Sequence, residues 1–196
     1  MLISVKITGI VKGYACFFVA KCQIGCDFWL GLVYFLIYCF RRKVMLSKVK
    51  SFGLNGIEGF LTEIETDIVG GVPHFEIVGL GDTAVKESKE RVKSAIRNSG
   101  FDYPSKHYTI NLAPADVKKE GPLYDLGIAV GILAATEQLT TKTYKDFVFV
   151  GELSLDGSIK KVKGVLPILI SARSMGYTKF VLPEENAEEA KFIAGM

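Results

Sequence analysis

The sequence predicts an α/β sandwich in which helices pack on a mixed β-sheet. Between residues 45 and 196, segments in which apolar and polar residues alternate, as in strands, are followed in turn by segments with helical periodicity. The connections between them are short, which is typical of one compact domain. The segment 124–137 is apolar almost all round, so it is expected to be a helix buried on most of its surface. These three observations indicate one layered domain.

The first strands are predicted from partial alternation. Residues 60–68 and 74–78 alternate between apolar and polar side chains, and Gly70-Gly71-Val72-Pro73 lies between them. Two neighbouring strands joined by a Gly-Gly turn predict an antiparallel hairpin.

A helix is predicted from Asp82 or Thr83, as the N-cap, to about Ser99, with Gly100 as the stop residue. The charged residues of this segment are expected on a solvated face, with Glu87 and Arg91 as an i, i+4 pair. The side chains expected to face the sheet are Val85, Val92, Ala95 and Ile96.

The second half of the chain continues the alternation. Asp156-Gly157 is a turn signal, Pro167 is tolerated in the first turn of a helix, and Gly176 ends that helix. The predicted strands are 108–112, 147–150, 153–155 and 179–182, and the predicted helices are 124–137, 165–175 and 184–193.

Composition changes sharply near residue 45. All four cysteines lie before it, as do six of the 24 basic residues and one of the 21 acidic residues. That leaves 18 basic and 20 acidic residues, a net charge of −2, for residues 45–196. The positive charge therefore belongs to the leader and does not indicate a nucleic-acid surface on the globular part.

The leader, residues 1–44, admits three interpretations: a membrane anchor, a misplaced start, and an unstructured or misfolded appendage. The apolar run 28–40 followed by Arg41-Arg42-Lys43 resembles a membrane anchor over residues 24–43 that would keep the rest of the chain in the cytoplasm. The alternative, which we favour, is a misplaced start, with the natural protein beginning at Met45. Cys22 and Cys26 have no second close pair to complete a zinc site.

Two segments resemble the proteolytic domain of the Lon peptidase family. They are Lys119-Glu120-Gly121-Pro122-Leu123-Tyr124-Asp125 and Gly151-Glu152-Leu153-Ser154-Leu155-Asp156-Gly157. The resemblance implies a nucleophilic serine at position 123 and its lysine base at position 166. Both positions hold leucine, so we expect a degenerate Ser–Lys dyad and no catalytic residue.

No other residues replace the dyad in the sequence. The hydroxyls of Ser154, Ser158 and Ser171 and the amines of Lys160, Lys161 and Lys163 have no evident mutual arrangement. We expect Ser154 to meet a strand neighbour, and an active peptidase is the disfavoured interpretation.

Cofactor and metal sites are likewise not expected. The segment 79–84 resembles a G-x-G-x-x-A dinucleotide fingerprint, but Asp82 would repel a pyrophosphate, so helix capping explains it better. His74 and His107 are expected to be structural. The chain contains no G-x-x-x-x-G-K-[ST] segment for binding ATP.

Residues 45–196 as a whole resemble the N-terminal domain of the magnesium-chelatase-like AAA+ ATPases of the ComM/YifB type. One departure is Gly81, where that family usually has proline. The stretches that carry the resemblance are 50–56, Phe75-Glu76-Ile77-Val78-Gly79-Leu80, 82–88, Ile110-Asn111-Leu112-Ala113-Pro114-Ala115-Asp116, Asp125-Leu126 with Ile128-Ala129, and 151–157.

This resemblance implies a Lon-like (ribosomal S5 domain 2-like) fold without peptidase residues. It further implies an AAA+ motor that follows the domain, needs ATP and Mg²⁺, assembles as a homo-hexamer and acts on branched DNA in recombination and transformation. We therefore expect a cytoplasmic, non-catalytic accessory domain whose partners are that motor and, through the assembly, DNA. The alternatives are a divergent Lon- or RadA-type peptidase and an inner-membrane-tethered adaptor.

Overall fold

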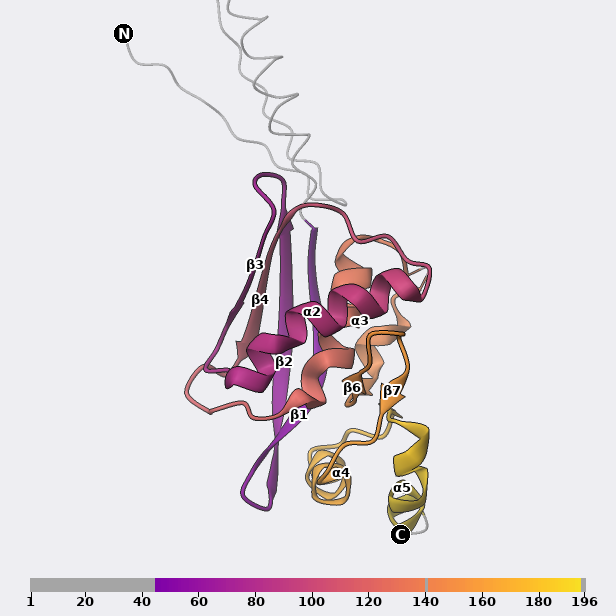
Figure 1. Ribbon diagram of the computed structural model, residues 1–196. Coiled ribbons are helices and arrows are strands. Elements are labelled where there is room, and N and C mark those ends of the chain that lie inside the picture. Colours follow the sequence, from indigo (N-terminus) through magenta and orange to yellow (C-terminus); the bar gives the residue numbers. More distant parts are fainter. Residues whose placement is uncertain (1–44, 140, 195–196) are drawn as a thin grey trace, which may run out of the picture. The chain divides into compact units, whose positions relative to one another are not determined.

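A computed structural model describes residues 45–139 and 141–194. The predicted leader, with its membrane-anchor and cysteine interpretations, lies outside these residues. Within them, no helix combines the length and apolar character that crossing a bilayer requires. A six-stranded sheet, in the order β3-β4-β2-β1-β5-β8, forms the centre of this part of the chain (Figure 1).

The two longest strands form a hairpin. β1 (Met45–Asn55) and β2 (Glu58–Val69) pair antiparallel, and the pair Asn55–Glu58 leaves only Gly56 and Ile57 in the loop. Gly56 has a φ of 64°, which glycine adopts without strain. A two-residue loop with glycine first is typical of a type II′ turn, whose twist matches that of the strands.

The predicted hairpin between residues 60–68 and 74–78 is wrong. β3 (His74–Val78) does not pair with β2, because β4 (His107–Ala113) lies between them. β4 runs antiparallel to β2 and parallel to β3. The Gly70-Gly71 segment marks a turn, but a turn does not decide which strands become neighbours.

The remaining strands are short. β5 (Val148–Phe149) runs parallel to β1, and β8 (Phe180–Val181) runs parallel to β5 at the edge of the sheet. β6 (Glu152–Leu153) and β7 (Ile159–Lys160) form a separate two-stranded sheet. Parallel and antiparallel pairs thus occur together, and the predicted α/β class with a mixed sheet is confirmed.

Two helices cover one face of the sheet. α2 (Thr83–Asn98) and α3 (Asp125–Ala135) lie side by side in front of the strands in Figure 1. Both were predicted, and α3 is buried nearly all round. Position 53 of β1 shows how closely this layer packs: a Cβ added to Gly53 would lie 2.1 Å from the hydroxyl of Tyr124 and 2.5 Å from the ring of Phe60.

Within the described residues, the other face of the sheet is covered near the β1–β2 turn. There α4 (Val165–Ser174) packs on the strands, and the Ser171 Oγ accepts a 2.9 Å hydrogen bond from the Gly59 N–H. α5 (Ala187–Ala194) follows at the lower end of Figure 1. Short 3₁₀ turns complete the described fold: η1 (Pro122–Tyr124), η2 (Thr143–Asp146) and η3 (Glu184–Asn186).

Candidate functional site

Leu123, the predicted serine position, is a core residue. It lies in η1, immediately before α3, and only 8 % of its surface is exposed. Its carbonyl accepts a 3.0 Å hydrogen bond from the Gly151 N–H, and the Gly151 carbonyl accepts a 3.1 Å bond from the Leu126 N–H. The turn that would present a nucleophile is therefore built from main-chain bonds and directs a hydrocarbon side chain into the core.

Leu166, the predicted lysine position, lies in the first turn of α4 and is 40 % exposed. It does not belong to the core cluster that contains Leu123. A Ser–Lys dyad needs a hydroxyl and an amine within hydrogen-bond reach of one another. These two positions supply neither group.

The substitute hydroxyls have structural contacts. Ser171 accepts the Gly59 N–H, and the Ser158 Oγ lies 2.7 Å from a carboxylate oxygen of Asp156. The Ser154 carbonyl accepts a hydrogen bond from the Gly157 N–H, and the Ser154 N–H donates one to the Ser158 carbonyl. These two bonds close the predicted turn at Asp156-Gly157. We see no hydroxyl–amine pair among the described hydrogen bonds that could act as nucleophile and base.

Asp82 lies at the N-terminus of α2. The resemblance of segment 79–84 to a dinucleotide fingerprint would put a phosphate at this helix end. One oxygen of the Asp82 carboxylate accepts the Val85 N–H at 2.8 Å, and the other accepts the Gly121 N–H at 3.1 Å. An anion at this helix end is thus supplied by the protein itself. Capping rather than dinucleotide binding explains the segment 79–84.

The loop before α2 has an unusual backbone. Leu80 has a φ of 55°, a left-handed conformation that non-glycine residues rarely adopt, and 58 % of its surface is exposed. Main-chain bonds hold it there: the Lys119 N–H donates to the Leu80 carbonyl, and the Asp82 N–H donates to the Lys119 carbonyl. The loop 79–82 and the segment before η1 are therefore fixed to each other.

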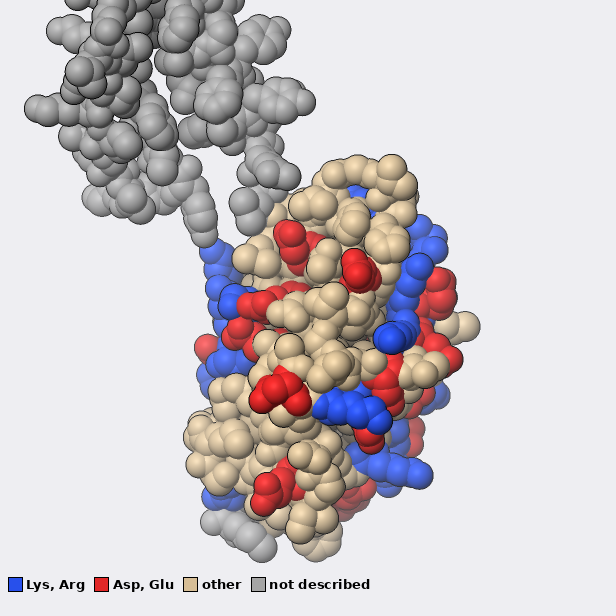
Figure 2. Space-filling model, turned by 90° about the vertical axis from the view of Figure 1, so that its left-hand side faces the viewer, with Lys and Arg blue, Asp and Glu red and all other residues tan. Residues whose placement is uncertain are grey.

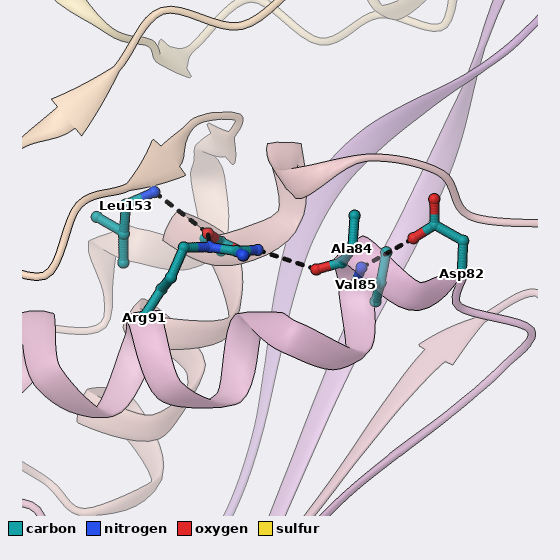
Figure 3. A network of polar contacts seen from close by, with 6 residues as sticks. Asp82, Ala84, Val85, Arg91 and Leu153 are labelled. Atoms are coloured by element: carbon teal, nitrogen blue, oxygen red, sulfur yellow. Dashed lines mark hydrogen bonds and ion pairs between the residues drawn. The ribbon is translucent and has the colours of Figure 1, made fainter.

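Arg91 and Asp125 form the central ion pair of this site (Figure 3). The guanidinium donates two bonds to the carboxylate, at 2.6 Å and 3.1 Å, and a third bond, at 2.9 Å, to the Ala84 carbonyl. The Leu153 N–H donates a further 3.3 Å bond to Asp125. Burial raises the pKa of the Asp125 carboxyl, and the hydrogen bonds from Arg91 oppose that rise.

Sequence reasoning missed this pair and placed Arg91 opposite Glu87 on the solvated face of α2. The two residues are separated by 34 positions, so helical spacing cannot reveal the contact. A signal was nevertheless present. Asp125 opens an apolar run, and a buried carboxylate requires a cation or several donors.

Lys119 is a second buried charge-bearing residue. Its side chain is fully buried, and its Nζ donates to the Pro114 carbonyl. Burial lowers the pKa of its ammonium group, while the nearby Asp116 carboxylate opposes that shift. The segment before η1 is thus folded around this side chain.

The two histidines lie opposite each other on neighbouring strands. His74 and His107 are register partners in β3 and β4, and their ring centroids are 5.1 Å apart. No set of three or more His, Cys, Asp or Glu side chains in the described ranges is arranged to hold a metal ion.

The fold and the site define a mixed α/β domain in which both positions predicted for a Ser–Lys dyad hold leucine. Asp82, Arg91 and Asp125 tie the loops of this site together. The family model for "Subunit ChlI of Mg-chelatase" matches residues 64–186, and the chain belongs to this family.

Its relatives include proteins of the predicted type. The chain is 42 % identical over 149 residues to "Competence protein ComM" of Haemophilus influenzae and 43 % identical over 150 residues to "Uncharacterized protein YifB" of Escherichia coli. Each match covers 76 % of this chain and 29 % of the relative, so the chain spans less than a third of their length. "Lon protease" of Finegoldia magna is 27 % identical over 161 residues, covering 78 % of this chain and 20 % of that protein.

Proposed function

We propose that residues 45–196 act as a non-catalytic accessory domain of a magnesium-chelatase-like AAA+ ATPase. The buried Leu123 carries this proposal, because it fills the serine position with a side chain that can neither attack a carbonyl nor transfer a proton. The apolar Leu166 at the lysine position adds support. Membership of the ChlI family and the likeness to ComM and YifB indicate the kind of protein the domain serves.

In this proposal the motor module binds ATP and Mg²⁺, assembles as a hexamer and processes branched DNA in the cytoplasm. The accessory domain contributes to assembly or to placement of the partner. The short match to each relative supports this division of labour, since most of each relative lies outside the part that resembles this chain.

A chimera tests the accessory role. The matching segment of the H. influenzae ComM protein is replaced by residues 45–194 of this chain, and ATP-dependent assembly and transformation frequency are measured. We expect the chimera to retain both activities and a variant that lacks the segment to lose them. Normal assembly and transformation without the segment would refute the accessory role.

Proteolysis tests the non-catalytic part of the proposal. We expect the full chain to leave casein intact, with and without ATP. Cleavage that disappears in Ser154→Ala would instead support a divergent peptidase.

A further inference from the structure

α2 carries a row of basic side chains on one flank. Lys86, Lys89, Lys93 and Arg97 lie at spacings of three, four and four residues. With 3.6 residues per turn, they fall within about 80° around the helix axis and extend along about 17 Å of it. We call these four residues the α2 stripe.

The cations of the α2 stripe have no acidic partner among residues 45–139 and 141–194. No carboxylate of the described residues forms an ion pair with Lys86, Lys89 or Lys93, and Arg97 lies over the ring of Tyr103 at 5.6 Å. α2 as a whole has five basic and two acidic residues, a net charge of +3. This helix is therefore basic on a domain whose net charge is −2.

The matching acidic surface lies elsewhere on the same domain. Residues 184–194, which form η3 and α5, contain four glutamates and one lysine, a net charge of −3. Glu184 and Glu185 are exposed, and no described ion pair includes either of them. In Figure 1, α2 crosses the front of the sheet while α5 lies beyond α4 at the far end, so the two surfaces remain apart in one molecule.

We infer that the α2 stripe binds the η3–α5 surface of a second copy of this chain. Opposite charges on two separate surfaces favour a head-to-tail contact, which repeats from copy to copy. Charge complementarity of this kind selects the partner and the register of the contact. The inference rests on the proposed function, in which the protein assembles from several copies, and it names a contact between copies of this domain. Its test uses this chain, whereas the accessory role is tested in a ComM chimera, so the two can fail separately.

Nucleic acid is the rival ligand for a basic helix. A phosphate backbone favours a broad field of one sign. Figure 2 shows the domain from the side of β3, and there basic and acidic side chains are interspersed among uncharged ones. Glu87 and Glu90 also lie on α2 itself. A protein surface of complementary charge fits this pattern better than a uniform polyanion.

Two charge-reversed forms of the full chain test the contact by sedimentation velocity. One carries Lys86→Glu and Lys93→Glu; the other carries Glu184→Lys and Glu185→Lys. We expect the unmodified chain to self-associate at about 0.01 M salt and to weaken at 0.15 M, where the Debye length falls from about 30 Å to about 8 Å. Each form alone should associate at least about tenfold more weakly, which is the change that 1.4 kcal/mol represents.

Mixing the two forms gives the decisive result. The acidic α2 of one form then faces the basic η3–α5 surface of the other, so association should return to within about threefold of the unmodified chain. Thermal unfolding of each form shows that the loss is not a folding defect, and Lys142→Glu, an exposed residue of another segment, serves as the matched control.

Three outcomes would overturn the inference: a monomeric unmodified chain at low salt, association that both forms retain, or no recovery in the mixture. A fourth outcome would overturn it in favour of nucleic acid as the ligand. In that outcome Lys86→Glu/Lys93→Glu, but not the other form, loses binding to a fluorescent DNA duplex, and the mixture shows no recovered self-association.

Discussion

Arg91 and Asp125 join α2 to α3 through two hydrogen bonds between one guanidinium and one carboxylate, at 2.6 Å and 3.1 Å. The Asp125 side chain is almost fully buried, whereas 21 % of the Arg91 side chain is exposed. The carboxylate also accepts the Leu153 N–H, so one buried anion links two helices and β6. This arrangement ties the start of α3, and with it position 123, to α2.

Arg91→Met should reduce the free energy of unfolding by about 3–5 kcal/mol, because it leaves the Asp125 carboxylate buried without its cation. Denaturant unfolding measures the change. The double variant Arg91→Met/Asp125→Leu should recover most of the loss, since it removes both charges. Lys86→Met, an exposed cation of the same helix, is the control and should change stability by less than about 0.5 kcal/mol. Equal effects of the two single substitutions would contradict this account.

Leu123→Ser should confer no proteolysis and should lower the free energy of unfolding by about 2–4 kcal/mol, through lost apolar burial and the cavity it leaves. Casein cleavage and urea unfolding measure the two parts. Leu166→Ser should have a much smaller effect, because that side chain is 40 % exposed. Cleavage of casein by Leu123→Ser would mean that a base is already in place.

Lys119→Met should change stability in a manner that depends on pH. Burial lowers the pKa of the Lys119 ammonium in the folded chain below its unfolded value of about 10.4. Folding therefore disfavours the protonated form of Lys119. The free energy of unfolding of the unmodified chain should rise as the pH increases from the folded pKa of Lys119 toward its unfolded pKa. Lys119→Met lacks this gain.

The measurement for Lys119 is the difference in unfolding free energy between the two chains at pH 7 and at pH 9.5. Any advantage of Lys119→Met should shrink at the higher pH. The comparison stops below pH 10, because burial raises the pKa of Tyr108 to about 12 and that tyrosine costs stability in stronger alkali. A difference that does not vary with pH would show that Lys119 stays protonated throughout.

Gly53→Ala should destabilise the domain by about 1–3 kcal/mol through overpacking. The new Cβ would lie 2.1 Å from the Tyr124 hydroxyl, and Tyr124 is fully buried and has little room to move. Gly70→Ala is the matched control, because no atom lies within 4 Å of the position that a Cβ would take there. Thermal unfolding of both variants checks the contrast, and equal midpoints would contradict it.

The sequence was sufficient to predict the helices and most strands, because periodicity and capping are local signals. Asp82 and Gly100 bound α2 as expected, and the apolar run beginning after Asp125 forms the buried α3. Pairing of the strands was harder. The turn 70–73 is visible in the sequence, but β4, which separates β2 from β3, begins only at His107.

The candidate site could be predicted only in part. Leucine at position 123 predicted the loss of a nucleophile, and the structure shows that this side chain fills the core. The contacts that hold the site join distant residues: Arg91 to Asp125, and Asp82 to Gly121. Helical spacing predicted Glu87 as the partner of Arg91. Arg91 pairs with Asp125 instead, because a buried carboxylate without a cation costs more free energy than an exposed one.

The two main-chain bonds of Gly151 to Leu123 and Leu126 have a wider consequence. They fix the backbone at position 123 without using any side chain, so serine and leucine can be exchanged there while the turn keeps its shape. Chemistry and architecture are separable at this point of the fold. The residue at position 123 can therefore change its chemistry without a change in the loop that holds it.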